Sequence, residues 1–157
     1  MKGYTSETIR NVALVGHGGC GKTTFLESAL LATGVIDRLG KVEDGNTVSD
    51  YDKMEIEKGF SINTSIVPVE WKDSKINFID TPGYFDFIGE VNAALRASEA
   101  AVILVDAGAG IQVGTEQAWK ACERYKMPRF IVINKRDKDE FDFYKTFNKL
   151  KAKFGET

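Results

Sequence analysis

The sequence predicts an α/β domain in three layers, with a mostly parallel sheet between helices. Short apolar segments alternate along the chain with longer segments in which apolar residues recur every three or four positions. This alternation is typical of strands joined by helices that pack on a parallel sheet. Polar loops follow three of the apolar segments. Because the carboxyl ends of parallel strands meet at one edge of the sheet, these loops are expected to converge there.

The loop after the first expected strand, residues 9–15, carries the most specific motif. It reads GHGGCGKT over residues 16–23 and fits the phosphate-loop pattern G-x-x-x-x-G-K-[ST]. A helix is expected over about residues 23–32, with Gly34 as its stop. Its apolar face comprises Phe25, Leu26, Ala29 and Leu30. Strand, glycine-rich loop and helix form the context that the motif requires, and a glycine-rich turn that fits by chance is the alternative.

The residue types of this loop suit the phosphates of a nucleotide. Small residues let successive backbone N–H groups point at an anion, and the helix start adds unpaired N–H groups. Lys22 is expected to bridge the β- and γ-phosphates, and the Thr23 hydroxyl to ligate Mg²⁺. The expected nucleotide contacts of this loop are Gly16, His17, Gly18, Gly19, Cys20, Gly21, Lys22, Thr23 and Thr24.

Residues 34–59 interrupt the alternation with a polar stretch that has no sustained period. A long loop in a compact domain is usually functional or disordered. Its end is acidic, with Asp50, Asp52, Glu55 and Glu57. In a phosphate-loop protein we expect a nucleotide-sensing lid, poorly ordered from residue 34 to about 57 when no γ-phosphate is present. A solvated loop is the plainer interpretation, and the two can coexist.

The remaining elements are expected in the following order. Strands at residues 60–71 and 75–79 form an antiparallel hairpin around Asp73 and Ser74, so one hairpin strand departs from the parallel sheet. Further strands are expected at residues 100–105 and 130–133, and helices at 86–98, 112–126 and 139–154. The residues expected to face inward from these helices are Ile88, Val91 and Leu95, then Val113, Ala118, Cys122 and Tyr125, then Phe141, Tyr144, Phe147, Leu150 and Phe154.

Two further loops carry residues with nucleotide chemistry. Asp80 opens the sequence DTPG after an apolar strand, where a carboxylate can hold Mg²⁺, and the Gly83 N–H can approach a γ-phosphate. A simple turn is the alternative for this motif. Asn134, Lys135 and Asp137 form the pattern N-K-x-D after another apolar strand. The Asp137 carboxylate can accept both N–H donors of guanine, a pair that adenine does not offer, while Lys135 is expected to lie over the base and brace the phosphate loop. A charged loop is the alternative.

With these residues the chain resembles the GTP-binding domain of the translational GTPases, most closely elongation factor G. The matching stretches are residues 16–24, 57–62, 80–89, 112–117 and 134–137. The resemblance covers nearly the whole chain. It implies a phosphate-loop NTPase fold of the Ras-like G-domain type, GTP or GDP with Mg²⁺ as cofactors, two nucleotide-sensing switches, and the ribosome as partner. By the same resemblance Thr23, Ser61 and Asp80 are the metal ligands, and Lys22, Ser61, Gly83 and Tyr84 stand at the catalytic positions.

Three positions depart from the family pattern. Ser61 replaces the Thr that binds Mg²⁺ and the γ-phosphate, and it keeps the hydroxyl. Tyr84 replaces the His that positions the attacking water, and a phenol with a pKa near 10 cannot replace imidazole as a base at neutral pH. Gly19 replaces an Asp of the phosphate loop. Together they resemble the elongation-factor-G-like branch, and they bear on the rate of hydrolysis rather than on nucleotide binding.

Two residues of the phosphate loop have alternative interpretations. His17, the only histidine, is expected to pack on the loop rather than to do chemistry. Cys20 lies near Lys22 and a helix start, which can acidify a thiol, but a small side chain is reason enough for it there. The same holds for Cys122 on a helix face.

Composition sets the remaining limits. At 157 residues, with 43% hydrophobic and 28% charged residues and a net charge of −2, the chain suits one globular domain without bulk attraction to DNA or membranes. The polar N-terminus, the absence of long apolar runs and two cysteines indicate a cytoplasmic protein. The resemblance implies that residues 1–157 are a GTP-binding domain incomplete at its C-terminus, a monomeric fragment that lacks the last strand and the Ser-Ala loop of the guanine site.

Three functions compete at this point. The first is a GTPase of translation-factor type. The second is a nucleotide-dependent binding module with little hydrolysis, which Tyr84 keeps open. The third, an ATP-using phosphate-loop kinase, is disfavoured by Asn134, Lys135 and Asp137.

Overall fold

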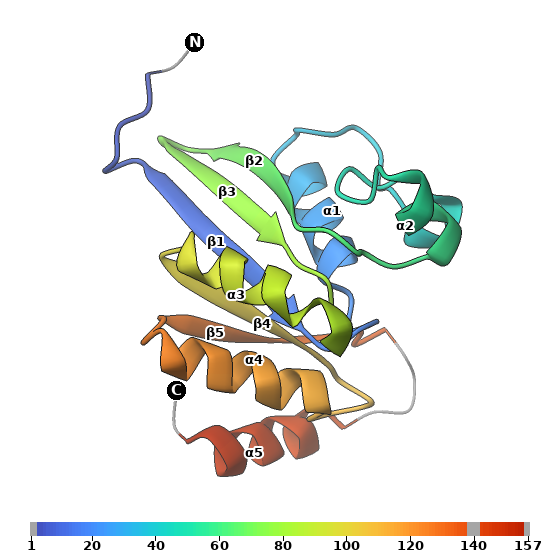
Figure 1. Cartoon of the computed structure of the whole chain (residues 1–157), viewed down its shortest axis with the longest axis vertical. Helices are drawn as coiled ribbons and strands as arrows, with labels where there is room; N and C mark the ends of the chain where they lie inside the picture. The colour runs from blue at the N-terminus through green and yellow to red at the C-terminus, as the bar shows by residue number, and fades with distance from the viewer. Residues whose placement is uncertain (1–2, 138–141, 156–157) are drawn as a thin grey trace.

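A computed structural model describes residues 3–137 and 142–155 as one mixed sheet with helices on both faces (Figure 1). The strands are β1 (Ile9–Gly16), β2 (Ser65–Trp71), β3 (Ser74–Asp80), β4 (Ala100–Asp106) and β5 (Arg129–Asn134). The α-helices are α1 (Lys22–Ala32), α2 (Lys53–Lys58), α3 (Ile88–Arg96), α4 (Val113–Arg124) and α5 (Phe143–Phe154). Short 3₁₀ turns lie at Val42–Asp44 and Phe85–Phe87. None of the helices in these ranges has the length and apolar composition that crossing a bilayer requires.

The strand order β2-β3-β1-β4-β5 confirms the expected sheet. β1 is parallel to β3 and β4, and β4 is parallel to β5, whereas β2 pairs antiparallel with β3. In register, Leu14 of β1 lies opposite Asp80 of β3 and Val102 of β4. The carboxyl ends of β1, β3, β4 and β5 therefore lie along one edge of the sheet, where the motif loops begin.

The core has two parts because neighbouring residues of a strand point to opposite faces of the sheet. Leu14 and Leu104 face α1, where Leu26 and Leu30 are fully buried. The opposite face is covered by α3, α4 and α5, as Figure 1 shows. Its buried residues include Ala13, Val15, Ile103, Val105, Leu95, Cys122 and Leu150. Burial of full-size side chains on both faces confirms the expected three layers.

The segment between α1 and β2 contains more structure than expected. It contains a short helix, α2, which the polar composition of the segment did not predict. The Asp52 side chain caps the N-terminus of α2 by accepting from Met54 N at 2.7 Å. Gly59 ends α2 in the left-handed region at φ +70°. The expectation that residues 34–59 form no regular element is therefore wrong. The strand expected from residue 60 begins only at Ser65, because the amides of Ile62 and Asn63 bond to Glu55 instead of a strand.

Some residues expected to face inward are exposed. Val113 is 69% exposed in the first turn of α4, before that helix reaches the core through Ala118 and Cys122. On α5, Leu150 is buried and Phe154 stacks on Trp119, but Tyr144 is 73% and Phe147 45% exposed. Phe147 lines the cavity beside β5 that is described below. Phe141 and the expected helix start at residue 139 lie outside the described residues.

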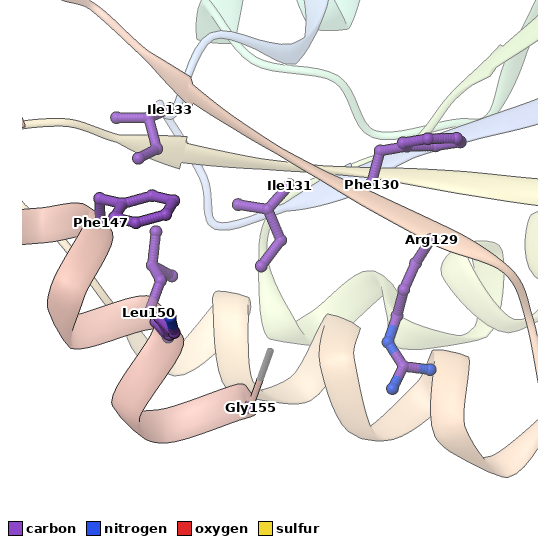
Figure 2. Close-up of a pocket in the computed structure, with 8 residues that line it drawn as sticks. Arg129, Phe130, Ile131, Ile133, Phe147, Leu150 and Gly155 are labelled. Atoms are coloured by element: carbon purple, nitrogen blue, oxygen red, sulfur yellow. The ribbon is translucent and has the colours of Figure 1, made fainter. Parts of the chain in front are cut away.

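The sheet edge at β5 adjoins an apolar cavity of about 480 Å³. Figure 2 shows Phe147 and Leu150 of α5 directed toward Ile131 and Ile133 of β5, with Phe130 on the far side of the strand. Phe130 is 67% exposed. An open, apolar edge strand usually needs cover to avoid pairing with another chain.

Candidate nucleotide and metal site

The three motif loops meet at the carboxyl edge of the sheet. Residues 16–21 leave β1 and enter α1, Asp80 ends β3, and Asn134 ends β5. Asn134 Nδ2 donates to Cys20 O at 3.1 Å, and Thr23 Oγ1 donates to Asp80 Oδ2 at 2.9 Å. The expected convergence is therefore confirmed by direct contacts between the loops. A cavity of about 340 Å³ lies over them, between the phosphate loop, residues 59–61 and Lys135.

The phosphate loop is held by its own lysine and by the N-K-x-D motif of residues 134–137, which is called the base-side motif below. Lys22 is 7% exposed, and its Nζ donates to the carbonyls of Gly16 at 3.3 Å and His17 at 3.2 Å. Gly21 has φ +92°, and a Cβ there would lie 2.4 Å from Asn134 Nδ2. Glycine is therefore required both for the left-handed turn into α1 and for the close approach of Asn134. Gly18, Gly19 and Gly21 of the loop line the cavity.

Five oxygen-bearing side chains gather next to Lys22 where β3 ends. Thr23 Oγ1 lies 3.5 Å from Ser61 Oγ, and Ser61 Oγ donates to Asp50 Oδ1 at 2.7 Å. Ser49 Oγ donates to Asp80 Oδ2 at 3.0 Å. The set brings the expected metal ligands Thr23, Ser61 and Asp80 together, and adds two residues from the segment before α2, Ser49 and Asp50. Sequence reasoning noted Asp50 only as part of an acidic stretch and missed Ser49.

This oxygen cluster fits a hard divalent cation. Asp80 Oδ1 and Asp50 Oδ2 are buried and make no hydrogen bond. Buried carboxylate oxygens without a donor are costly, and a cation would satisfy them. Hydroxyl and carboxylate oxygens are the protein ligands that Mg²⁺ prefers, usually together with water and phosphate oxygens. In the described ranges, no group of three His, Cys, Asp or Glu side chains has the arrangement of a metal site. The cluster therefore offers two carboxylates and three hydroxyls to a cation rather than a cage of carboxylates.

Burial raises the pKa of Asp80 to about 6, although the Lys22 ammonium and the hydrogen bonds from Thr23 and Ser49 act to lower it. The folded-state pKa is thus above the usual value of an aspartate, near about 3.9. Protonation of Asp80 therefore stabilises the folded chain. This stabilisation is fully present below about pH 4 and is lost as the pH rises through about 6.

We expect the metal-free, nucleotide-free chain to lose stability from about pH 4 to about pH 7, and Asp80→Asn to remove on the order of 2 kcal/mol of that loss, because Asn does not titrate. Urea unfolding in EDTA at several pH values measures it. Asp73→Asn, an exposed carboxylate on the β2–β3 turn, is the matched control. Equal pH slopes for Asp80→Asn and the wild type would contradict the assignment.

The base-side motif is braced by a charged pair. Lys135 Nζ lies 3.1 Å from Asp106 Oδ2 and donates to the Gly19 carbonyl. Burial tends to raise the pKa of Asp106, but hydrogen bonds from the Ala109 and Gly108 amides and from Lys135 outweigh it, and the pKa is lowered. Lys135 therefore reaches the phosphate loop as expected. Asp137 lies exposed in the turn that follows Lys135, so its expected reading of a base stays a prediction.

Tyr84 and Phe60 cover the outer side of the phosphate loop. Their ring centroids lie 4.6 Å apart, and a Cβ on Gly18 would meet the Tyr84 ring at 3.2 Å. Gly83 is equally close to the loop, since a Cβ there would lie 2.5 Å from Lys22 Nζ and 2.6 Å from Gly18 Cα. Tyr84 itself is 46% exposed. Ser61, Gly83 and Tyr84 thus line the same cavity as Lys22, and their expected roles at a γ-phosphate stay predictions.

The remaining loop residues take structural places. His17 packs against Gly114 at the start of α4, where an added Cβ would lie 2.6 Å from His17 Cα. Burial raises the pKa of the Cys20 thiol despite Lys22 and Lys135, so acidification of this thiol is not found. Burial likewise raises the pKa of Cys122 to about 11, which suits a residue of the core. Thr24 is exposed at the cavity rim.

Comparison with known proteins places this chain in a family. The family model described as "Elongation factor Tu GTP binding domain" matches residues 7–157. Elongation factor G of Granulibacter bethesdensis is 46% identical over 147 residues, which are 94% of this chain and 21% of that protein. Ribosome-releasing factor 2, mitochondrial, of Drosophila melanogaster is 40% identical over 152 residues, 97% of this chain and 20% of that protein. The chain thus spans about a fifth of the length of these curated relatives.

Solved structures agree with the sequence relatives. A crystal structure of a protein from Thermus thermophilus matches with a TM-score of 0.90 and 42% identity, over 94% of this chain and 22% of that one. A bacterial selenocysteine-specific elongation factor, EF-Sec, shares the fold with a TM-score of 0.74 at 21% identity, over 92% of this chain and 23% of that one. The chain therefore belongs to the family of elongation factor Tu GTP-binding domains.

Proposed function

We propose that this chain binds GTP and GDP together with Mg²⁺, hydrolyses GTP, and acts as the nucleotide switch of a cytoplasmic factor that works on the ribosome. The observation that carries the proposal is the contact of Thr23, Ser61 and Asp80 beside Lys22, which gathers residues from the phosphate loop, the segment before β2 and the end of β3. A ribosomal partner and a monomeric chain without DNA or membrane partners belong to the same proposal. So does the interpretation of residues 1–157 as part of a longer G domain.

Each residue has a role in this proposal. Lys22 Nζ, now on two loop carbonyls, turns to the β- and γ-phosphates, and the amides of residues 16–24 surround them. Thr23, Ser61 and Asp80 hold Mg²⁺, which when bound neutralises charge on the phosphate oxygens. Asn134 braces the phosphate loop through Cys20 O, Lys135 through Gly19 O, and Asp137 selects guanine. Gly83 and Ser61 sense the γ-phosphate.

A nucleotide-dependent binding module with little hydrolysis is the second candidate, and Tyr84 favours it. Its ring packs on Gly18 and Phe60 at the position where the family has a histidine, and a phenol does not act as a base at neutral pH. The two candidates share the nucleotide site and differ only in turnover. Comparing GTP hydrolysis by the full-length protein with and without ribosomes separates them.

Titration with GDP and ADP tests the shared part of the proposal. We expect GDP to bind at least about a hundredfold more tightly than ADP, because adenine leaves the Asp137 carboxylate without its two donors. EDTA is expected to weaken binding of GDP. Calorimetry, or displacement of a fluorescent GDP analogue, measures both. Equal affinities for GDP and ADP would contradict the assignment of the base site.

A further inference from the structure

Glu27 is a buried carboxylate outside the phosphate, metal and base contacts described above. It lies on α1, one helical turn after Thr23, and is 1% exposed. Among the ion pairs found in residues 3–137 and 142–155, none involves Glu27. A buried carboxylate is costly unless hydrogen-bond donors surround it. The buried Glu27 carboxylate therefore requires hydrogen-bond donors around it.

The donors come from the segment that follows α1. Glu27 Oε2 accepts from Gly40 N at 2.9 Å, and Glu27 Oε1 accepts from Val48 N at 2.7 Å. A Cβ on Gly40 would lie 2.6 Å from Glu27 Oε2, so a larger residue would break the contact. One carboxylate thus joins both ends of residues 40–48 to α1. In Figure 1 this segment runs beside α1, with α2 at its outer end.

Residues 40–48 form a closed loop between these two contacts. Lys41 N donates to Asn46 Oδ1 at 2.7 Å, and Gly45 N donates to Val42 O at 3.0 Å. The loop therefore has internal hydrogen bonds that hold its shape, and Glu27 fixes that shape to α1. Without Glu27 nothing else in these contacts ties the Gly40 and Val48 amides to the helix.

The two residues after the loop lead directly to the oxygen cluster. Ser49 is 1% and Asp50 5% exposed. Ser49 Oγ donates to Asp80 Oδ2, and Asp50 Oδ1 accepts from Ser61 Oγ. Since the Val48 amide is bonded to Glu27, the next two residues are placed relative to the same helix that carries Thr23. The Ser65 hydroxyl, which donates to Ser49 O at 2.8 Å, holds the same residue from the side of β2.

We propose that Glu27 is a positioning residue: its carboxylate holds the loop 40–48 on α1 and thereby keeps Ser49 and Asp50 at the cation site. The part about the cation rests on the proposed function, whereas the attachment of the loop does not. The proposal also separates the polar segment after α1 into a held part, residues 40–48, and a following part that contributes Ser49, Asp50 and Ser61 to the oxygen cluster. For residues 40–48 it differs from the expectation that the whole stretch to about residue 57 is poorly ordered without a γ-phosphate.

Amide hydrogen exchange of the 157-residue chain with GDP tests the attachment. Glu27→Gln keeps the volume but places an NH₂ group against one of the two backbone donors. We expect protection at Gly40 or Val48 to fall about tenfold or more, since a hydrogen bond to a charged group is lost. The amides of Ile62 and Asn63, held by Glu55 Oε1, report in the same sample that the fold is intact. Glu27→Asp keeps the charge and shortens the side chain, so it is expected to fail as well.

Asp44→Asn is the matched control, because Asp44 is an exposed acidic residue of the same loop. We expect it to leave exchange at Gly40 and Val48 unchanged. Wild-type exchange at these amides in Glu27→Gln would overturn the attachment. Fast exchange at Gly40 and Val48 in the wild type itself would overturn it too, and would support disorder of the whole segment.

Mg²⁺ dependence of GDP retention tests the positioning. Release of a fluorescent GDP analogue is followed at increasing Mg²⁺ concentrations. We expect Glu27→Gln to need about tenfold more Mg²⁺ for half-maximal retention, while its affinity in EDTA stays at the wild-type value. An unchanged Mg²⁺ requirement with lost protection would overturn the positioning role. Failure of the wild type to bind GDP would overturn the proposed function instead, and the exchange experiment would still decide the attachment.

Discussion

Asp137→Asn is expected to lower the affinity for GDP by about a hundredfold or more and to raise the affinity for XDP by a similar factor. The carboxylate accepts from N1–H and N2–H of guanine, whereas an asparagine amide offers one acceptor and one donor. Against guanine this leaves two donors facing each other. Xanthine has a C2 oxygen at that place, which the Asn amide can satisfy. Competition of GDP, XDP and ADP against a fluorescent nucleotide measures the exchange of specificity.

The control for this substitution is Asp73→Asn, which makes the same chemical change on an exposed residue in the turn between β2 and β3. We expect it to leave both affinities unchanged. Loss of GDP binding without a gain for XDP would show that Asp137 supports the turn after Lys135 rather than contacting the base. In that case guanine selectivity would need another residue of the Asn134 to Asp137 loop.

The parts of the fold that the sequence predicted are those in which a repeated local pattern and burial agree. β1 and β4 were predictable because their residues are apolar on both faces, as in Leu14 and Val15 or Leu104 and Val105, which are all fully buried. The loops were predictable because each motif follows such a strand. The Asn134 contact with Cys20, between residues far apart in the chain, follows from the topology that these strands impose.

The segment after α1 was not predictable in the same way, because long-range polar contacts hold it. Glu27 lies on α1 between Leu26 and Leu30. Nothing in the local sequence shows that its hydrogen-bond partners are the amides of Gly40 and Val48. Glu55 likewise bonds Ile62 and Asn63 across the end of α2. A buried carboxylate with backbone donors leaves no periodic signal.

The exposed aromatic residues of α5 have a different cause. The helical period placed Tyr144, Phe147 and Leu150 on one side of the helix, but only Leu150 of the three is buried. Leu150 contacts the core, whereas Phe147 borders the cavity beside β5 (Figure 2). Periodicity predicts which residues are apolar together, and only the extent of the sheet decides which of them are covered.

Tyr84→His in the full-length protein is expected to raise ribosome-stimulated GTP hydrolysis by about a hundredfold, because an imidazole can position and activate a water where a phenol cannot. Without the ribosome, turnover by the chain described here is expected to stay at or below roughly 10⁻⁴ to 10⁻² s⁻¹. The structure adds a second requirement. The Tyr84 ring packs on Gly18 and Phe60, so a smaller ring leaves Phe60 without its partner.

Phe60→Ile is the companion variant, alone and combined with Tyr84→His, since Phe60 contacts Tyr84. If the aromatic pair restrains the site, the double variant is expected to turn over faster than Tyr84→His alone, with Phe60→Ile alone remaining slow. Single-turnover hydrolysis with ribosomes separates the chemical step from nucleotide release. Unchanged or lower turnover in both Tyr84→His variants would show that Tyr84 is adapted to its position, and that this factor uses the Tyr84–Phe60 pair for regulation or catalysis in place of a histidine.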